Sequence, residues 1–286
     1  INLSTLLSNQ TLVEKPVYKL ILGHESSNKS NVAYFGTIIP KGSYQFSSSV
    51  SAREADNQLS PIGEVKNTAL SKSDIFTSLA KYNNNGYSIL SLENFEMSYG
   101  IPSSPEGHID GVDLKMKKTS QKFKYHADIN LGKYNTLDVE QGHVNYEHRE
   151  FENNKSYHAV LLSHVINYFK VDISSDIFKF GGLYQRKKFI AGGFYWTPNT
   201  YEDKLAIYAS KKGVIFGYDT DYSGRSEHRS IRPRSGETFF SNLDANEVRN
   251  RQFTLVSGGV SFFKERENLS NYYQILFTSR APSIED

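Results

Sequence analysis

Hydrophobic and polar residues alternate along much of this chain with a period of two. In the clearest segment, residues 122–131, the apolar positions Phe123, Tyr125, Ala127, Ile129 and Leu131 alternate with Lys122, Lys124, His126, Asp128 and Asn130. Residues 43–53 repeat the pattern, with Tyr44, Phe46 and Val50 among their apolar positions. Successive side chains of a strand point to opposite faces of its sheet, which a helix cannot reproduce. Both segments are therefore predicted to be strands with one apolar face.

Weaker alternation extends this prediction to the rest of the chain. It occurs in residues 32–39, 157–165, 205–210, 214–218, 253–263 and 272–278. Polar turn formers separate these segments, at residues 25–31, 83–86, 102–107, 152–156, 198–203, 223–236 and 264–271. Helix-compatible spacing is found in residues 71–81, where we nevertheless expect no amphipathic helix. Residues 1–286 are predicted to be one all-β domain or barrel segment, with about eleven to fourteen antiparallel strands.

Alternation by itself fits both a soluble β-sandwich and a membrane β-barrel. Two features favour the barrel: the polar positions are often charged, which suits a water-filled interior, and the long strands are regularly spaced, which suits an up-and-down meander. The chain has no continuous apolar stretch long enough for a transmembrane helix. Barrel strands need no such stretch, because lipid-facing and interior-facing residues alternate along them.

Composition excludes several classes of function. Charged residues make up 22% of the 286 residues and the formal net charge is +2, so a general nucleic-acid-binding surface is not indicated. Cysteine is absent, which excludes disulfides, thiolate catalysis and cysteine-ligated metal sites. The 19 Tyr and 18 Phe residues could form the aromatic girdles of a barrel, although a β-sandwich core also favours them.

Several short segments, taken in order, carry a resemblance to a known family. They are Gly86-Tyr87-Ser88, Glu96-Met97-Ser98, Tyr99-Gly100-Ile101-Pro102, Ile109-Asp110-Gly111-Val112-Asp113-Leu114, Val144 to Glu152, Arg251-Gln252-Phe253-Thr254, Val256 to Val260, and Arg280-Ala281-Pro282-Ser283-Ile284-Glu285. Together they resemble TonB-dependent outer-membrane receptors, especially the branch that includes zinc-uptake receptors.

The resemblance implies a location, a function and partners. The chain would be an antiparallel up-and-down transmembrane β-barrel of the bacterial outer membrane, serving TonB-energised uptake of a metal or metal complex. The implied partners are outer-membrane lipid and lipopolysaccharide, a TonB-type energising protein that acts through a plug, and the metal or metal-chelate cargo. Neither catalysis nor a resident cofactor is expected, and zinc or another metal would be bound only as cargo.

The chain departs from the family pattern at both ends. Receptors of this kind have an N-terminal TonB box and a plug domain, neither of which is recognisable here. Their barrels also continue past the Arg-x-Pro turn to a final strand that usually ends in an aromatic residue. We therefore expect a partial barrel without a recognisable plug, which would leave sheet edges that lipid does not tolerate.

His148 and Glu150 are the candidate metal ligands. They lie two residues apart in a predicted strand, so both side chains project to one face, and imidazole and carboxylate groups both bind zinc. The resemblance places the pair at the family's Tyr-x-His-x-Glu strand end. A solvated strand end with alternating charges is the alternative. His108, in the short loop after Pro102, is a weaker candidate, because zinc-uptake relatives often have a longer loop rich in His and Asp.

Other polar clusters have simpler explanations. Residues 219–224 imitate the start of a calcium-binding loop, but Ser230 stands where the bidentate Glu is required, so an exposed acidic turn is predicted. Basic residues at Arg225, His228, Arg229, Arg232 and Arg234 are expected in a long loop. The alternative functions are a passive porin, an outer-membrane hydrolase using Ser163 and His164 or Ser226 and His228, and a soluble β-sandwich binding module.

Overall fold

The computed structural model describes residues 11–104, 111–152, 159–193, 199–212, 218–232, 250–266 and 269–277. The strands are β1 (Val17–Glu25), β2 (Ser30–Lys41), β3 (Tyr44–Ala55), β4 (Gln58–Ser60), β5 (Gly63–Val65), β6 (Leu70–Asn83), β7 (Gly86–Ile101), β8 (Val112–Leu131), β9 (Tyr134–Glu152), β10 (Val160–Ser174), β11 (Phe178–Gly193), β12 (Asn199–Lys212), β13 (Tyr218–Arg232), β14 (Asn250–Arg266) and β15 (Leu269–Phe277).

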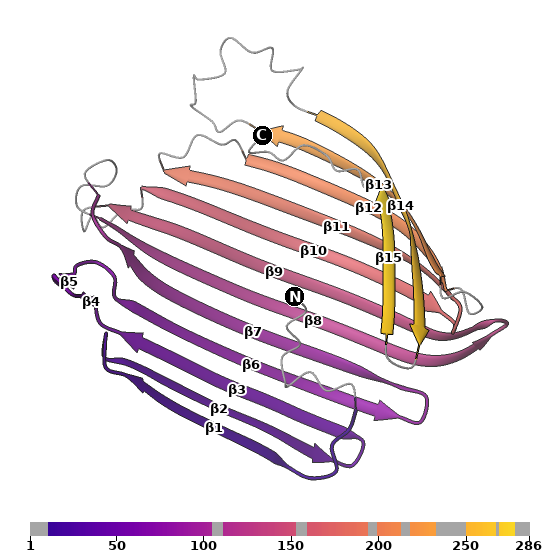
Figure 1. The fold of residues 1–286 in the computed structure, drawn as a ribbon, viewed down its shortest axis with the longest axis horizontal. Coiled ribbons are helices and arrows are strands. Elements are labelled where there is room, and N and C mark those ends of the chain that lie inside the picture. Colours follow the sequence, from indigo (N-terminus) through magenta and orange to yellow (C-terminus); the bar gives the residue numbers. More distant parts are fainter. Residues whose placement is uncertain are drawn as a thin grey trace. The chain divides into compact units, whose positions relative to one another are not determined.

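Thirteen of these strands form one sheet in the order of the chain, from β1 to β15, and β4 pairs with β5 in a separate hairpin (Figure 1). Every pairing given for the sheet is antiparallel. The predicted all-β, up-and-down topology is thus confirmed. The described ranges contain no helix, hence none that could span a membrane, and residues 71–81 belong to β6.

The chain divides into two compact units. Unit 1 comprises Ile1–Phe123, His143–Val165 and Phe189–Thr197, and unit 2 comprises Lys124–Gly142, Ile166–Lys188 and Pro198–Asp286. The divisions fall inside β8, β9, β10 and β11. They therefore do not follow a linker of the kind that usually separates two domains.

Short and long connections alternate along the chain. Residues 42–43, 84–85 and 132–133 are tight turns, whereas residues 56–69 and 102–111 are longer connections. Gly42 and Gly132 have φ angles of 60° and 62°, which glycine adopts without a steric penalty. Because the strands are antiparallel, all tight turns of a unit lie at one end of its strands. We call this the turn end and the opposite end the loop end.

In unit 1, one face of the sheet exposes large apolar side chains. Leu20, Phe35, Val50 and Ile75 are successive cross-strand partners from β1 to β6. Nearer the turn end, Ile39, Phe46, Leu79 and Leu90 form a second row from β2 to β7. These eight side chains are each 39–66% exposed. We call this surface the apolar face, and it is the reverse of what a water-soluble sheet would present.

The opposite face of unit 1 is polar, and part of it is closely covered. Gln45, Ser47, Ser49 and Ser78 are buried there. The Gln45 side chain is 2% exposed, and its Oε1 accepts a hydrogen bond of 2.9 Å from the backbone N–H of Val13. The segment before β1 therefore contacts this polar face.

Unit 2 separates its two faces in the same way. Phe180 and Tyr184 of β11 and Leu205 and Ile207 of β12 are 42–53% exposed on its apolar face. Charged side chains of β8 to β11 lie on the other face, as described below. The inversion of apolar and polar faces thus occurs independently in both units, which is the arrangement of an outer-membrane barrel wall.

The largest error of the sequence prediction concerns β13. Residues 219–224, predicted as an acidic turn, and the basic residues Arg225, His228, Arg229 and Arg232, predicted in a loop, all lie in this strand. Both long neighbours pair with it, for example at Asp203↔His228 and His228↔Gln252. These backbone pairings form the strand although its sequence lacks apolar alternation. Arg234 lies outside the described residues.

Candidate functional site

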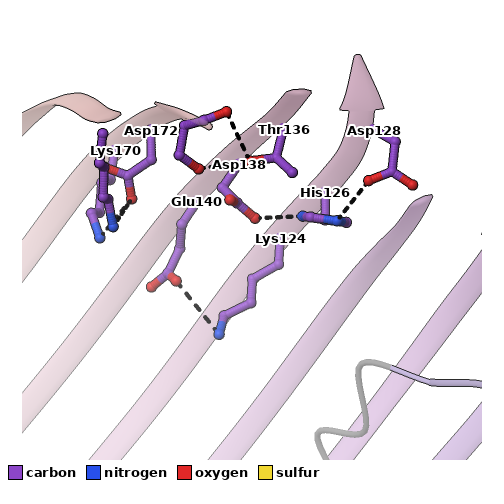
Figure 2. Close-up of polar contacts among 10 residues, drawn as sticks. Lys124, His126, Asp128, Thr136, Asp138, Glu140, Lys170 and Asp172 are labelled. Atoms are coloured by element: carbon purple, nitrogen blue, oxygen red, sulfur yellow. Dashed lines mark hydrogen bonds and ion pairs between the residues drawn. The ribbon is translucent and has the colours of Figure 1, made fainter. Parts of the chain in front are cut away.

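The polar face of unit 2 carries a ladder of paired charges across β8, β9 and β10 (Figure 2). Lys124 Nζ lies 3.6 Å from Glu140 Oε2. The Tyr168 hydroxyl donates a hydrogen bond of 2.7 Å to the other carboxylate oxygen of Glu140. Tyr168 reaches it across Gly142, where a Cβ would collide with the tyrosine ring. A glycine in β9 therefore gives the aromatic side chain room to approach the strand.

A second step of the ladder lies nearer the turn end. His126 Nδ1 is 2.8 Å from Asp138 Oδ1, and His126 Nε2 is 3.8 Å from Asp128 Oδ1. Thr136 Oγ1 lies 2.6 Å from Ser174 Oγ. Figure 2 shows His126 between the two aspartates, with its ring edge directed to each of them. Two carboxylates are thus placed to hold a histidine side chain on this face.

Asp172 is the most buried carboxylate of the ladder, with 6% of its surface exposed. Its Oδ2 lies 3.0 Å from Lys170 Nζ and 3.4 Å from Lys179 Nζ, and its Oδ1 accepts a hydrogen bond from the Tyr208 hydroxyl. Gly181 lies under the group, where a Cβ would meet both the carboxylate and the Tyr208 ring. Burial of this charge is therefore compensated by two cations and one hydroxyl.

The chemistry of this ladder suits a wet interior rather than a fixed metal centre. In the part of the chain that the structure describes, no group of three or more His, Asp or Glu side chains is arranged to hold one metal ion. The cations and anions are instead paired across neighbouring strands, for example Lys124 with Glu140 and Lys179 with Asp172. A surface of this kind remains hydrated and presents both signs of charge to a hydrophilic solute.

The structure places His148 and Glu150 together on β9 of unit 1, as the sequence predicted. His148 Nε2 lies 3.5 Å from Glu150 Oε1, and the two side chains are 18% and 28% exposed. The contact lacks the geometry of a hydrogen bond, and within the described residues this buried Nε2 atom has no hydrogen-bond partner. Imidazole nitrogens and carboxylate oxygens are both ligands of Zn²⁺, and here an imidazole nitrogen with no hydrogen-bond partner lies beside a carboxylate. Its role in metal binding stays a prediction.

Aromatic side chains also lie on this part of unit 1. The His164 ring of β10 is 4.8 Å from the Phe189 ring and 6.2 Å from the Tyr146 ring, centroid to centroid. The sequence analysis considered His164 only as a partner of Ser163. Adjacent strand residues point to opposite faces, so Ser163 is not directed at His164. The side chains of Ser226 and His228 lie outside the described residues.

One residue that the sequence analysis missed is Asn67, which joins the loop ends of β7 and β8. Its side-chain Nδ2 donates to the carbonyl oxygens of Ile101 (2.7 Å) and Val112 (3.2 Å). Added Cβ atoms at Gly100 or Gly111 would collide with Asn67. The glycine of the Tyr-Gly-Ile-Pro segment is therefore needed for close approach. The predicted candidate His108 and the Arg280–Glu285 segment lie outside the described residues.

Comparison with known proteins bears on the fold. No protein-family model matches the chain, and no curated protein matches it. Among solved structures, the FrpB iron transporter from Neisseria meningitidis (F3-3 variant) is similar, with a TM-score of 0.71 and 13% sequence identity. The match covers 95% of this chain and 48% of that transporter, so the chain spans about half the transporter's length. At this identity the likeness shows the fold alone: an antiparallel up-and-down sheet resembling an outer-membrane transporter barrel.

Proposed function

We propose that this chain forms part of the wall of an outer-membrane receptor that takes up a metal or metal complex, energised by a TonB-type protein. The observation that carries the proposal is the inversion of faces in both units. Apolar residues such as Phe35 and Leu205 are exposed, while polar residues such as Gln45 and Asp172 are buried on the other face. Lipid would contact the first face, and hydrophilic cargo and the plug would lie against the second.

The same observation supports a location in the outer membrane. A strand segment of about ten residues, tilted by about 45°, spans an apolar band of roughly 25 Å. In β3 this segment runs from Tyr44, beside Lys81, to Glu54, which accepts a hydrogen bond of 2.6 Å from Ser71. Between them lie the two apolar rows of unit 1. In the intervening row, Ser48 Oγ donates a 3.2 Å hydrogen bond to the Phe76 carbonyl and lies 3.4 Å from Thr77 Oγ1.

The uptake experiment uses the full-length gene product expressed in bacteria that lack their own metal receptors. Cells are given radiolabelled zinc or iron chelates, and uptake is compared with and without a protonophore and with and without a functional TonB system. Saturable accumulation that both treatments abolish is the expected result. Uptake that neither treatment changes, together with open-channel conductance in planar bilayers, would identify a passive porin instead.

His148 provides a sharper test of the cargo path. Replacement by alanine (His148→Ala) removes a buried nitrogen that faces Glu150, so metal affinity of the full-length receptor should fall roughly 10-fold or more by calorimetry. His24→Ala is the matched control, because His24 lies on the opposite, apolar face and its Nδ1 is 2.9 Å from Asn31 Oδ1. Equal affinities for the wild type and His148→Ala would remove this residue from the site.

A further inference from the structure

Lysine and aromatic side chains border the apolar face of unit 1 at its turn end. Lys41, Tyr44 and Lys81 are cross-strand partners of β2, β3 and β6, and all three are exposed. The Lys81 ammonium lies 5.7 Å from the centre of the Tyr44 ring, within cation–π range. This row is two residues from the apolar row that contains Phe46 and Leu79. The lysines therefore stand about 7 Å beyond the last apolar side chains.

Unit 2 repeats this arrangement with different residues. The Lys133 ammonium lies 4.5 Å from the centre of the Phe178 ring, and the Lys211 ammonium lies 5.5 Å from the same ring. Lys133 lies in the tight turn at residues 132–133, Phe178 directly follows the turn at residues 175–177, and Lys211 stands near the turn end of β12. The nearby Asp176 carboxylate accepts a bond of 3.3 Å from Asn135. Two units thus place lysines on aromatic rings at the same end of their strands.

Two cations near the other border of the apolar face are paired with carboxylates. Toward the loop end, Lys117 Nζ lies 3.2 Å from Glu96 Oε1 in unit 1, and Arg186 Nε lies 2.7 Å from Asp203 Oδ1 in unit 2. By contrast, the sequence from 38 to 48 and from 79 to 90 contains Lys41 and Lys81 and no Asp or Glu. Lys117 and Arg186 are thus paired with carboxylates, whereas Lys115, also toward the loop end of unit 1, lies 4.9 Å from the centre of the Phe151 ring. Lys41 and Lys81 have no acidic residue among their near neighbours in sequence.

We infer that the four turn-end lysines, Lys41, Lys81, Lys133 and Lys211, bind the phosphate groups of anionic phospholipids in the leaflet at the turn end. Short turns of outer-membrane barrels lie on the periplasmic side, so this is the inner leaflet. Lysine side chains extend from an apolar surface to the headgroup region, and aromatic rings favour the same depth. The Tyr44 and Phe178 rings limit the motion of the Lys81, Lys133 and Lys211 ammonium groups and hold them at this level. The inference rests on the proposed outer-membrane location.

The test measures which lipids the full-length protein retains. The protein is reconstituted in vesicles of phosphatidylcholine with and without phosphatidylglycerol, extracted, and examined by native mass spectrometry. Phosphatidylglycerol should be retained in preference to phosphatidylcholine. Each Lys→Gln substitution at Lys41, Lys81, Lys133 or Lys211 should weaken this preference roughly five-fold, since one lysine near an anionic surface contributes that much. The Lys→Arg variants should retain the preference.

Lys117→Gln is the matched control, because it removes one lysine from the same face at the loop end. Equal phosphatidylglycerol retention by the quadruple Lys→Gln variant and the wild type would overturn the inference. So would an equal loss in Lys117→Gln, or a turn-end loss confined to lipid A rather than phosphatidylglycerol. Heat-modifiable mobility on gels identifies variants that do not fold. For any lysine whose Lys→Gln variant does not fold, lipid retention by the corresponding Lys→Arg variant tests the inference instead. Failure of the wild type to insert into any vesicle would instead contradict the outer-membrane proposal itself.

Discussion

The polar faces of the two units are built from different kinds of side chain. In unit 1, the area around Gln45 and Ser47 is uncharged, almost fully buried and contacted by the segment at Val13. In unit 2, the corresponding face carries ion pairs such as Lys124–Glu140, whose side chains remain 37% and 28% exposed. Small neutral groups are used where protein packs against the sheet, and charge pairs where water has access. The difference indicates that the area around Gln45 in unit 1 is a packing surface and that the ladder of unit 2 is a solvated one.

The strongest test of this difference between the units removes the cations that compensate the buried Asp172 carboxylate. Replacing both Lys170 and Lys179 by methionine leaves this buried carboxylate with only the Tyr208 hydroxyl. We expect the free energy of unfolding to fall by about 3 kcal/mol, at the low end for a broken buried pair, because the lysines are 39% and 45% exposed. Urea unfolding of the full-length protein in lipid vesicles measures this change.

Adding Asp172→Asn to the same variant provides its internal control. The amide keeps the shape of the side chain but removes the uncompensated charge, so most of the lost stability should return. If the triple variant is as unstable as the double variant, packing of the lysine stems rather than charge holds this region together, and the contrast between the units loses its electrostatic basis.

A smaller effect on stability is expected at Gly181, which lies beneath the same group. Gly181→Ala places a Cβ against the Asp172 carboxylate and the Tyr208 ring, and overpacking of this kind costs about 2 kcal/mol. Gly182→Ala is the matched control, because its Cβ would meet its nearest neighbour, the Ala206 carbonyl oxygen, at an ordinary 3.7 Å. Thermal melting of both variants should show a lower midpoint for the first and little change for the second. Identical midpoints would mean that Asp172 and Tyr208 move aside freely.

The strands with strict alternation could be predicted from the sequence, and those without it could not. Phe123 and Tyr125 are exposed on one face of β8 while Lys124 and His126 pair on the other, as the pattern indicated. In β13, however, both alternating sets of positions in the sequence contain polar residues, so no local signal distinguishes it from a loop. Its pairing with β12 and β14 supplies the missing information, because backbone hydrogen bonds form a strand irrespective of its side chains.

The residues of the candidate site also fall into a group that the sequence predicts and a group that it does not. His148 and Glu150 lie within one strand, where spacing alone fixes their common face, and this part was predictable. Asp172, Lys179 and Tyr208 come from three strands, and the separation of 36 positions between Asp172 and Tyr208 leaves no local pattern to connect them. Asn67 was missed for the same reason, since its partners Ile101 and Val112 are 34 and 45 residues away.

The smallest expected effect tests the packing surface of unit 1. Gln45→Leu keeps the buried volume but removes the oxygen that accepts the Val13 N–H, so the free energy of unfolding should fall by about 1 kcal/mol. Proteolysis of the full-length protein near Val13 should become faster, because the segment loses its hydrogen bond to β3. Gln121→Leu, at an exposed position of β8, is the control and should change neither quantity. Unchanged proteolysis in Gln45→Leu would show that the segment is held by other contacts, and the buried serines of unit 1 would then need an explanation other than a covering segment.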